Sequence, residues 1–345
     1  MNITFLIGNG FDLSCGMKSR YSDIYAAYSA QGPTNNELLE KFKSDLPNWG
    51  DFEIELGKNV HRFSCEDNLL ECLRDFKKFL TKYLEDESRK CLVGLYVPAQ
   101  RGQAVLNDFA FSLNEFYKFN THHIASMIQS KIDQDTLQYN FISFNYTTLF
   151  DRLLSDTEMR LLNNHGSQTK IGAPLHIHGT LFDEVTLGLD NEEQLINPIF
   201  SLSKAGKRAV LKPFFNSIYD PERTENAKQL ILDSDVICVY GMSLGDSDLT
   251  WRNVLLEWLK SSKGHILFLY EYQYSSLKDL TKDHEMEIED AAKEEFLNNC
   301  GIVDHEDRLQ NQIFIPVAHN IFDFQHTTYT IGAKTYTPPM YFSNW

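Results

Sequence analysis

Several features common in other protein classes are missing from this chain of 345 residues. No stretch approaches the roughly 20 apolar residues of a membrane-spanning helix, and Ile3–Ile7 is too short for the apolar region of a signal peptide. Basic residues are in deficit, with 32 Lys and Arg against 48 Asp and Glu and a formal charge of −16. Nonspecific nucleic-acid binding requires clustered cations for the phosphates. The sequence therefore predicts a cytoplasmic protein that neither enters membranes nor binds nucleic acid nonspecifically.

Cysteine pairs of the kind that bind zinc or exchange disulfides are also missing. The six cysteines include no CxxC pair, which argues against a zinc ribbon and against a thioredoxin-type redox site. Low-complexity tracts and internal repeats are absent too, whereas aromatic residues make up 13% of the chain. This composition favours a folded protein with a substantial core. We expect the cysteines to be buried, reduced thiols.

Short apolar runs alternate with helical patterns along the chain, which predicts an α/β fold. The runs typical of buried strands are Ile3–Ile7, 141–144, Leu175–Ile177, Val236–Tyr240, Ile266–Tyr270 and Ile313–Val317. Helical patterns follow several of them, at 148–154, 224–233, 250–260 and 282–296. Residues 180–221 show no clear period, and we expect them to be irregular. The alternation of strands and helices predicts a Rossmann-like parallel sheet.

A long helical block interrupts this alternation. It contains an amphipathic stripe with apolar residues at three- and four-residue spacing, namely Leu69, Leu73, Phe76, Leu80, Tyr83 and Leu84. We expect the stripe to pack within the molecule, and an interface in a homo-oligomer is the alternative. The predicted organisation is a core of residues 1–36 and 137–325, a helical insertion of residues 37–136, and a C-terminal tail of residues 326–345.

A glycine-containing turn follows the first predicted strand. The glycines of Gly8-Asn9-Gly10 would allow the backbone to approach a phosphate near the N-terminus of a helix. A full dinucleotide fingerprint has a third glycine where this chain has Leu13. The motif is thus compatible both with nucleotide binding and with a plain strand-to-helix turn. For Asp12, near the start of the helix, the structural explanation is a helix cap.

Two further polar residues stand at the ends of apolar runs. Asn145 follows the run 141–144, and His178 follows Leu175–Ile177. Ligands of open α/β sheets bind outside the carboxyl ends of the strands, so the two side chains could meet over one ligand. The structural alternatives are an Asn that hydrogen-bonds its own backbone and an ordinary structural histidine. His176 would share a strand face with His178, but no carboxylate or cysteine motif accompanies the pair, so we expect no metal.

Two acidic motifs complete the candidates. Asp246-Ser247-Asp248 follows the run 236–240, where two carboxylates could hold a divalent cation and a nucleotide diphosphate. Capping of the next helix is the favoured structural explanation for Asp248. The second motif, Trp49-Gly50-Asp51-Phe52-Glu53, lies in the helical block. It is explained either by a helix cap with a packed Trp or by a carboxylate that the block supplies to the site.

Five segments together resemble the AbiH family of bacteriophage abortive-infection proteins. They are LIGNGFDLSCG, NWGDFE, SFNYT, HIHG and GMSLGDSD, and they follow the family's order between residue 6 and about residue 250. The combination of GNGFD with WxDFE is the most specific part of the match. AbiH proteins are in turn similar to the sirtuin-like NAD-binding fold. The resemblance implies a sirtuin-like parallel sheet with a large helical insertion.

The resemblance also implies roles for individual residues. Asn145 and His178 would be catalytic residues at the nicotinamide ribose, with Gly179 beside them. The remaining contacts to NAD would come from Gly8, Asn9, Gly10, Phe11 and Asp12 at the pyrophosphate turn, and from Gly241, Ser243, Asp246 and Asp248 on the adenosine side. This chain has GNGFD where sirtuins have GAGxS, so Asn9 and Asp12 have no direct counterpart there.

The four-cysteine zinc module of protein deacetylases is absent, and defence proteins of this fold without that module tend to be NAD hydrolases. The resemblance therefore implies cleavage of NAD to nicotinamide and ADP-ribose, with NAD as the substrate and no cofactor required. A neutral His with a pKa of about 6.5 could accept a proton from a ribose hydroxyl or a water that an Asn orients. Activation by a phage-derived trigger is expected, because unregulated NAD cleavage would kill the host cell.

Two other functions remain open from the sequence. One is a non-catalytic module that senses a nucleotide or ADP-ribose and acts with a partner. The other is a transferase or nuclease that uses Asp246 and Asp248 with a metal ion. Loss of function on changing Gly8 or Gly10, but not His178, would favour the sensor, and dependence on a divalent cation would favour the metal enzyme.

Overall fold

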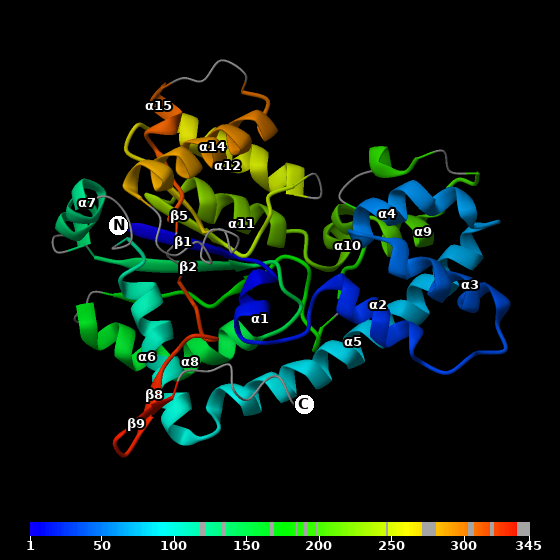
Figure 1. Ribbon diagram of the computed structural model, residues 1–345. Helices are drawn as coiled ribbons and strands as arrows, with labels where there is room; N and C mark the ends of the chain where they lie inside the picture. Colours follow the sequence, from blue (N-terminus) through cyan, green and yellow to red (C-terminus); the bar gives the residue numbers. More distant parts are fainter. Residues whose placement is uncertain are drawn as a thin grey trace.

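The computed structural model describes residues 1–117, 122–132, 136–165, 169–183, 185–189, 192–196, 199–245, 248–270, 281–302, 307–317 and 321–336. Its centre is a sheet in the order β3-β2-β1-β5-β6-β7, with β4 also paired to β2 (Figure 1). The strands are β1 (Asn2–Ile7), β2 (Gln138–Ser143), β3 (Lys170–Ile171), β4 (Leu175–His176), β5 (Val236–Tyr240), β6 (Ile266–Tyr270) and β7 (Ile313–Phe314). Every pairing described in this sheet is parallel. The predicted α/β class with a parallel sheet is confirmed.

Strand β1 lies between the two halves of the sheet. From β1 the chain continues, through the helical block, to β2 on one side, and it later crosses to β5 on the other. The last residues of the three strands lie in register, since Ile7 pairs with Ser143 and with Tyr240. A parallel sheet in which the strand order reverses in this way has a crevice at the carboxyl ends of the central strands. The segments after β1, β2 and β5 therefore meet at one edge of the sheet.

Both faces of the sheet are covered, which explains why the strands are nearly continuous apolar runs. In β1, Phe5 and Ile7 belong to one hydrophobic cluster and Leu6 to the other. The first face is covered by α1 (Gly10–Ser14), α6 (Ala99–Asn114) and α8 (Leu149–His165), drawn below the sheet in Figure 1. The second is covered by α11 (Arg223–Leu232), α12 (Leu249–Ser261) and α14 (Lys282–Asn299), drawn above it.

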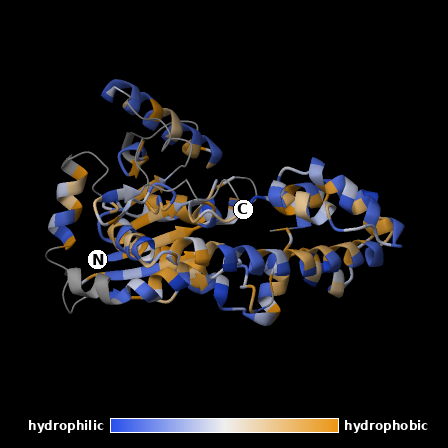
Figure 2. Cartoon of the chain, turned by 60° about the horizontal axis from the view of Figure 1, so that its bottom comes forward, coloured by the Kyte–Doolittle hydropathy of each residue, from blue (hydrophilic) through white to orange (hydrophobic). Residues whose placement is uncertain are grey.

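Helix α5 (Glu66–Tyr96) is the longest described element. It runs from below the sheet to a second group of helices on the right of Figure 1, which includes α2 (Tyr21–Ser29), α3 (Glu37–Asp45) and α4 (Phe52–Asn59). Its predicted stripe packs within the molecule, since Leu69, Phe76 and Leu80 are at most 1% exposed. Figure 2 shows mainly hydrophobic strands and helices with alternating hydrophobic and hydrophilic residues, as expected for a sheet covered by helices on both faces.

The helical block shares its core with the sheet. Phe76 of α5 and Phe5 of β1 belong to the same hydrophobic cluster, and α7 (His122–Ile132) also lies in this part of the chain. The division of the chain after residues 36, 136 and 325 stays a prediction. In the predicted tail, β8 (Tyr329–Ile331) and β9 (Lys334–Tyr336) form an antiparallel hairpin.

The segment predicted to be irregular between residues 180 and 221 contains two helices, so that prediction was wrong. Helix α9 (Lys204–Val210) is capped by Ser203, whose hydroxyl accepts hydrogen bonds from two backbone N–H groups of the first turn. Helix α10 (Lys212–Tyr219) has a proline in its first turn, a position where the missing N–H costs nothing. Both helices are shorter than the window in which a helical period is detected.

The expectation of buried, reduced cysteines is confirmed only in part. All six cysteines are free thiols, and four are buried, whereas Cys65 is exposed and Cys300 is half-buried. Among the helices that the structure describes, none combines the length and the apolar character of a membrane span.

The aromatic core under α5 provides a test of the packing. Phe76 stacks on Phe52 with ring centroids 4.8 Å apart and also contacts Tyr28 edge to face. We expect Phe76→Ala to lower the free energy of unfolding by about 3–5 kcal/mol, because it removes a buried ring and leaves a cavity. Urea denaturation measures this loss. Lys78→Ala, at an exposed position of the same helix, should change stability by less than about 0.5 kcal/mol, and equal losses would contradict the assignment of Phe76 to the core.

Candidate active site

A cavity of about 220 Å³ opens at the carboxyl ends of β1, β2 and β5. The segment after β4 and helices α1, α2, α4, α5 and α10 also contribute to its wall. Of the residues predicted to form a site, those that line it are Gly8, Asn9, Asp12, Asn145, His178, Gly241, Ser243 and Asp248. They come from four separate strand ends and a helix start, so the folded sheet brings together what the sequence separates.

Three predicted site residues are placed differently, and a fourth is not described. Phe11 is fully buried, and its ring packs edge to face against Phe109, Phe150 and two other rings, so it supports the turn from behind. Gly10 and Gly179 are not among the described residues that line the cavity. Asp246 lies outside the described residues.

The glycines of the first turn are needed for close backbone packing. A Cβ atom on Gly8 would lie 2.5 Å from the Gly241 carbonyl oxygen, and one on Gly10 would lie 2.4 Å from the Gly241 Cα. The N–H groups of the turn are also engaged, since Gly8 donates to the Tyr240 carbonyl and Gly10 to the Gly241 carbonyl. Of the two explanations for these glycines, the strand-to-helix turn accounts for what the structure describes.

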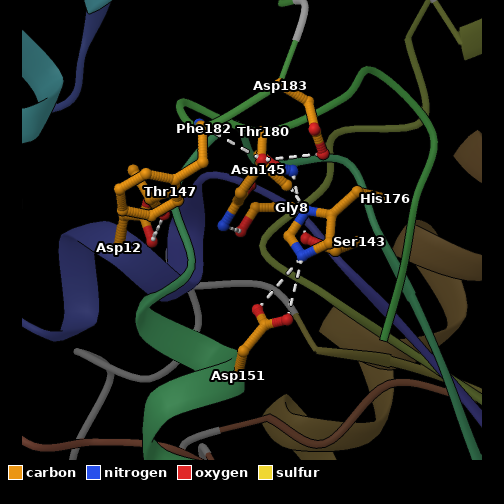
Figure 3. A network of polar contacts seen from close by, with 10 residues as sticks. All are labelled: Gly8, Asp12, Ser143, Asn145, Thr147, Asp151, His176, Thr180, Phe182 and Asp183. Atoms are coloured by element: carbon orange, nitrogen blue, oxygen red, sulfur yellow. Dashed lines mark hydrogen bonds and ion pairs between the residues drawn. The ribbon is translucent and has the colours of Figure 1, made fainter. Parts of the chain in front are cut away.

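A buried polar network lies beside this turn (Figure 3). The Thr147 hydroxyl contacts both oxygens of the Asp12 carboxylate, at 2.9 and 2.7 Å, and the Asn145 side-chain amide donates to the Gly8 carbonyl at 3.0 Å. Asp12 therefore does not cap its helix, and Asn145 does not bond its own backbone as a turn residue. Both side chains tie the end of β2 to the segment after β1.

Asp12 is held in an environment that opposes its charge. The residue is 2% exposed, and burial raises the pKa of its carboxyl from 3.8 to about 7, although the hydrogen bonds to Thr147 and Asn145 act in the opposite direction. A buried carboxylate is stable only where partners replace its hydration. Asp12 therefore exchanges its proton near neutral pH.

His176 links the backbone of Asn145 to the carboxylate of Asp151. Its Nδ1 lies 3.0 Å from the Asn145 carbonyl oxygen, and its Nε2 lies 3.1 Å from both oxygens of Asp151 (Figure 3). Burial lowers the pKa of His176, but the hydrogen bond and the charge of Asp151 outweigh burial and raise it above the usual value. No motif in the sequence links His176 to Asp151, and this pair holds the backbone that carries Asn145.

His178 has the opposite electrostatic character. It lies in the cavity wall near the rings of Phe144 and Tyr146, whose centroids are 5.8 and 6.3 Å from that of the imidazole. Burial, and then the positive charges of Lys212 and Arg223, lower its pKa well below the usual value. Its Nδ1 is buried and has no hydrogen-bond partner among the described residues. His178 is thus a neutral imidazole with an unused nitrogen at the edge of the sheet.

A family model matches the sequence that forms this site. The model described as "Bacteriophage abortive infection AbiH" covers residues 4–270 of the chain. The chain belongs to the AbiH family. The match extends from β1 to the end of β6 and so includes every strand end at the cavity. A comparison with curated proteins finds no match to this chain.

In this AbiH chain the WGDFE segment supplies a helix cap, a packed Trp and a carboxylate at the site, each from a different residue. Trp49 is 6% exposed and packs against Phe42 and Phe52. Asp51 caps α4 by accepting hydrogen bonds from two backbone N–H groups of its first turn. The third member, Glu53, lines the cavity, so the helical block does place a carboxylate at the strand ends.

Glu53 forms an ion pair with Lys212, a residue that no sequence motif marked as part of the site. The Lys212 ammonium donates to the Glu53 carboxylate at 2.6 Å, and both side chains are largely buried, at 6% and 12% exposed. Lys212 begins α10 and also lines the cavity. Nothing in the sequence pointed to Lys212, because it lies in the segment without a helical period. The pair joins α10 to α4 and sets the charge near His178.

The acidic motif after β5 is only partly described. Asp248 occupies the position before α12 but makes no side-chain capping hydrogen bond, so its favoured explanation as a cap was wrong. The residue lines the cavity. Among the described residues, no group of three or more His, Cys, Asp or Glu side chains is arranged to hold a metal ion.

The raised pKa of Asp12 leads to a pH-dependent prediction. Between pH 4 and pH 7 the unfolded chain loses the Asp12 proton while the folded protein keeps it, so this group lowers stability progressively over that range. We expect Asp12→Asn to raise the melting temperature relative to the parent protein more at pH 8 than at pH 5. Asp290→Asn, at an exposed position of α14, is the matched control. An equal effect of Asp12→Asn at both pH values would show that Asp12 is ionised normally.

The buried ion pair gives a second prediction. Lys212→Met should cost about 3–5 kcal/mol of unfolding free energy, because the largely buried Glu53 carboxylate loses its cation. Lys212→Met combined with Glu53→Leu should cost less than the first change alone, as measured by urea denaturation. Lys212→Met alone should also raise the pKa of His178, because one of the positive charges that lower this pKa is gone. A histidine NMR titration, assigned with His178→Ala, measures this shift; an unchanged pKa would remove Lys212 as a cause.

Proposed function

We propose that this AbiH protein acts in abortive infection by hydrolysing NAD to nicotinamide and ADP-ribose in the cytoplasm. The observation that carries the proposal is His178, a neutral imidazole with an unpartnered buried nitrogen in a cavity that Asn145 also lines. The family connects the chain to bacteriophage abortive infection. The cleavage of NAD is the step that we add.

The chemistry of the bond determines what the site has to supply. When the bond between the ribose anomeric carbon and the nicotinamide nitrogen breaks, its electron pair neutralises the pyridinium ring. Positive charge then develops on the ribose, a water adds to the anomeric carbon, and one proton is released. No strong acid is required. The site needs groups that stabilise a cationic sugar, position the water and accept a proton.

Residues of the cavity have the appropriate chemistry for these tasks. We assign proton acceptance from a ribose hydroxyl or from the attacking water to the Nδ1 of His178. Asn145 would bind the ribose hydroxyls. The Glu53 carboxylate in the same wall, and Asp12 in its ionised form, would favour positive charge on the sugar. Lys212 is the cation in the described wall and would attract the anionic half of the dinucleotide.

The cavity volume limits how NAD would bind. Small-molecule sites usually enclose about 300–1,000 Å³, more than the 220 Å³ found at the strand ends. We therefore assign the nicotinamide and its ribose to the cavity and the adenosine half to the open side near Gly241 and Ser243. A Rossmann-like, sirtuin-like fold is part of the proposal, and the strand order β3-β2-β1-β5-β6-β7 is compatible with it.

Chromatography of NAD, nicotinamide and ADP-ribose after incubation with the purified protein tests the proposal. We expect nicotinamide and ADP-ribose in equal amounts. His178→Ala should lower the rate by about a hundredfold to ten-thousandfold, the usual contribution of a general acid–base group, and Asn145→Ala should lower it strongly as well. His284→Ala, at an exposed position, should leave the rate unchanged. Intact NAD after incubation with extract from phage-infected cells, which supplies a trigger, would contradict the proposal.

The same assay separates the two alternative functions. A sensor would bind NAD or ADP-ribose in calorimetry without turnover, and His178→Ala would still signal. Changes at Gly8 or Gly10 are unsuitable for this comparison, because an added Cβ collides with the Gly241 backbone and disturbs the fold. Activity that a chelator abolishes would instead support the metal-dependent transferase or nuclease.

A further inference from the structure

A second cavity lies between α5, α9, α10 and residues 185–187. Its volume is about 320 Å³, larger than that of the strand-end cavity and within the range of small-molecule sites. Its apolar wall includes Leu73, Leu187 and Phe215. The ring of Phe215 stacks on Tyr219, with centroids 4.3 Å apart. The cavity therefore offers an apolar and aromatic surface of the kind that binds a planar ring.

The charged residues that line this cavity are cationic. Arg74 and Lys77 come from α5 and Arg208 from α9, and the described lining contains no Asp or Glu. The Lys77 ammonium lies 5.9 Å from the centre of the Phe215 ring, whereas Arg74 and Arg208 have no acidic partner among the described residues. In a chain with a formal charge of −16, two such arginines at one cavity indicate an anionic ligand.

A buried hydroxyl gives an independent indication of a ligand. Thr186 lines the cavity and is 4% exposed, yet its Oγ1 has no hydrogen-bond partner among the described residues. Leaving a buried hydroxyl unpaired costs about 1–3 kcal/mol. A polar ligand in the cavity would satisfy it.

We propose that this cavity binds a small phosphorylated ligand with a planar ring, the chemistry of a nucleotide, and that its occupation alters the environment of His178. The phosphate would lie between Arg74 and Arg208, and the ring would lie on the apolar side with Phe215. This binding does not depend on whether the strand-end cavity cleaves NAD.

The two cavities share a wall, which provides the physical connection. The Thr186 N–H donates to the His178 carbonyl at 2.9 Å, and the Tyr146 hydroxyl donates to the Thr186 carbonyl at 3.1 Å. Tyr146 and His178 line the strand-end cavity, whereas Thr186 lines the basic one. Leu211 and Lys212 are likewise divided between the two. A ligand that restrains Thr186 therefore restrains the backbone that holds His178.

Calorimetry with AMP as the probe and adenosine as its uncharged counterpart tests the site. AMP should bind the full chain much more tightly than adenosine, and Arg74→Gln or Arg208→Gln should each weaken AMP binding roughly tenfold. Both positions are exposed, so the variants should fold. Lys78→Gln, on the same helix but outside the cavity, should bind as the parent does. Absence of AMP binding, or equal binding of adenosine, would overturn the proposal.

Two further measurements separate this site from the strand-end cavity and test the connection. His178→Ala should keep its affinity for AMP, and loss of binding there with full binding in both arginine variants would place AMP in the other cavity and overturn the proposal. The His178 ring signals in NMR spectra should shift on addition of AMP in the parent but not in the Arg74→Gln and Arg208→Gln double variant. Unshifted signals in a parent protein saturated with AMP would refute the connection. Neither readout involves NAD turnover.

Discussion

The close approach of two backbone turns is the constraint on which the site depends. Gly8 and Gly10 after β1 lie against Gly241 after β5, at distances that leave no room for a Cβ atom on any of the three. The Asn145 amide adds the end of β2 to this contact through the Gly8 carbonyl. Three strand ends are thereby fixed within one small volume. Because the glycines have no side chains, the two turns can approach closely, and this contact fixes the positions of the polar residues around them.

The second property of the sheet edge is that neighbouring titratable groups have their pKa values shifted in different directions. Burial favours the neutral form of every titratable group, so it raises the pKa of Asp12 to about 7 and lowers the pKa of His178 well below its usual value. His176 differs because the Asp151 carboxylate favours its charged form. Groups of different basicity side by side are what proton transfer requires. The same burial makes the site costly for stability, as functional sites commonly are.

The helices outside the sheet complete the site and connect it to the rest of the molecule. Glu53 on α4 and Lys212 on α10 form their ion pair at the cavity wall, so the helical block supplies the partner of a cation that lowers the pKa of His178. Helices α5 and α9, which carry the two arginines of the basic cavity, are themselves joined by Glu66, which accepts hydrogen bonds from Ser203. Both cavities thus depend on how the helical block is docked, and a change in that docking reaches both.

The sequence by itself determined the buried strands, the amphipathic stripe of α5 and the strand ends that carry Gly8, Asn145, His178 and Gly241. These features are encoded over a few residues, by apolar period and by residues that end a strand. Only the tertiary structure decided that Thr147 binds Asp12 and that Lys212 meets Glu53, and it overturned the local explanations of Asp12, Asn145 and Asp248. The partners in these pairs lie 135 and 159 residues apart. Local sequence specifies a side chain's chemistry, whereas strand order and helix docking select its partner and hence its charge.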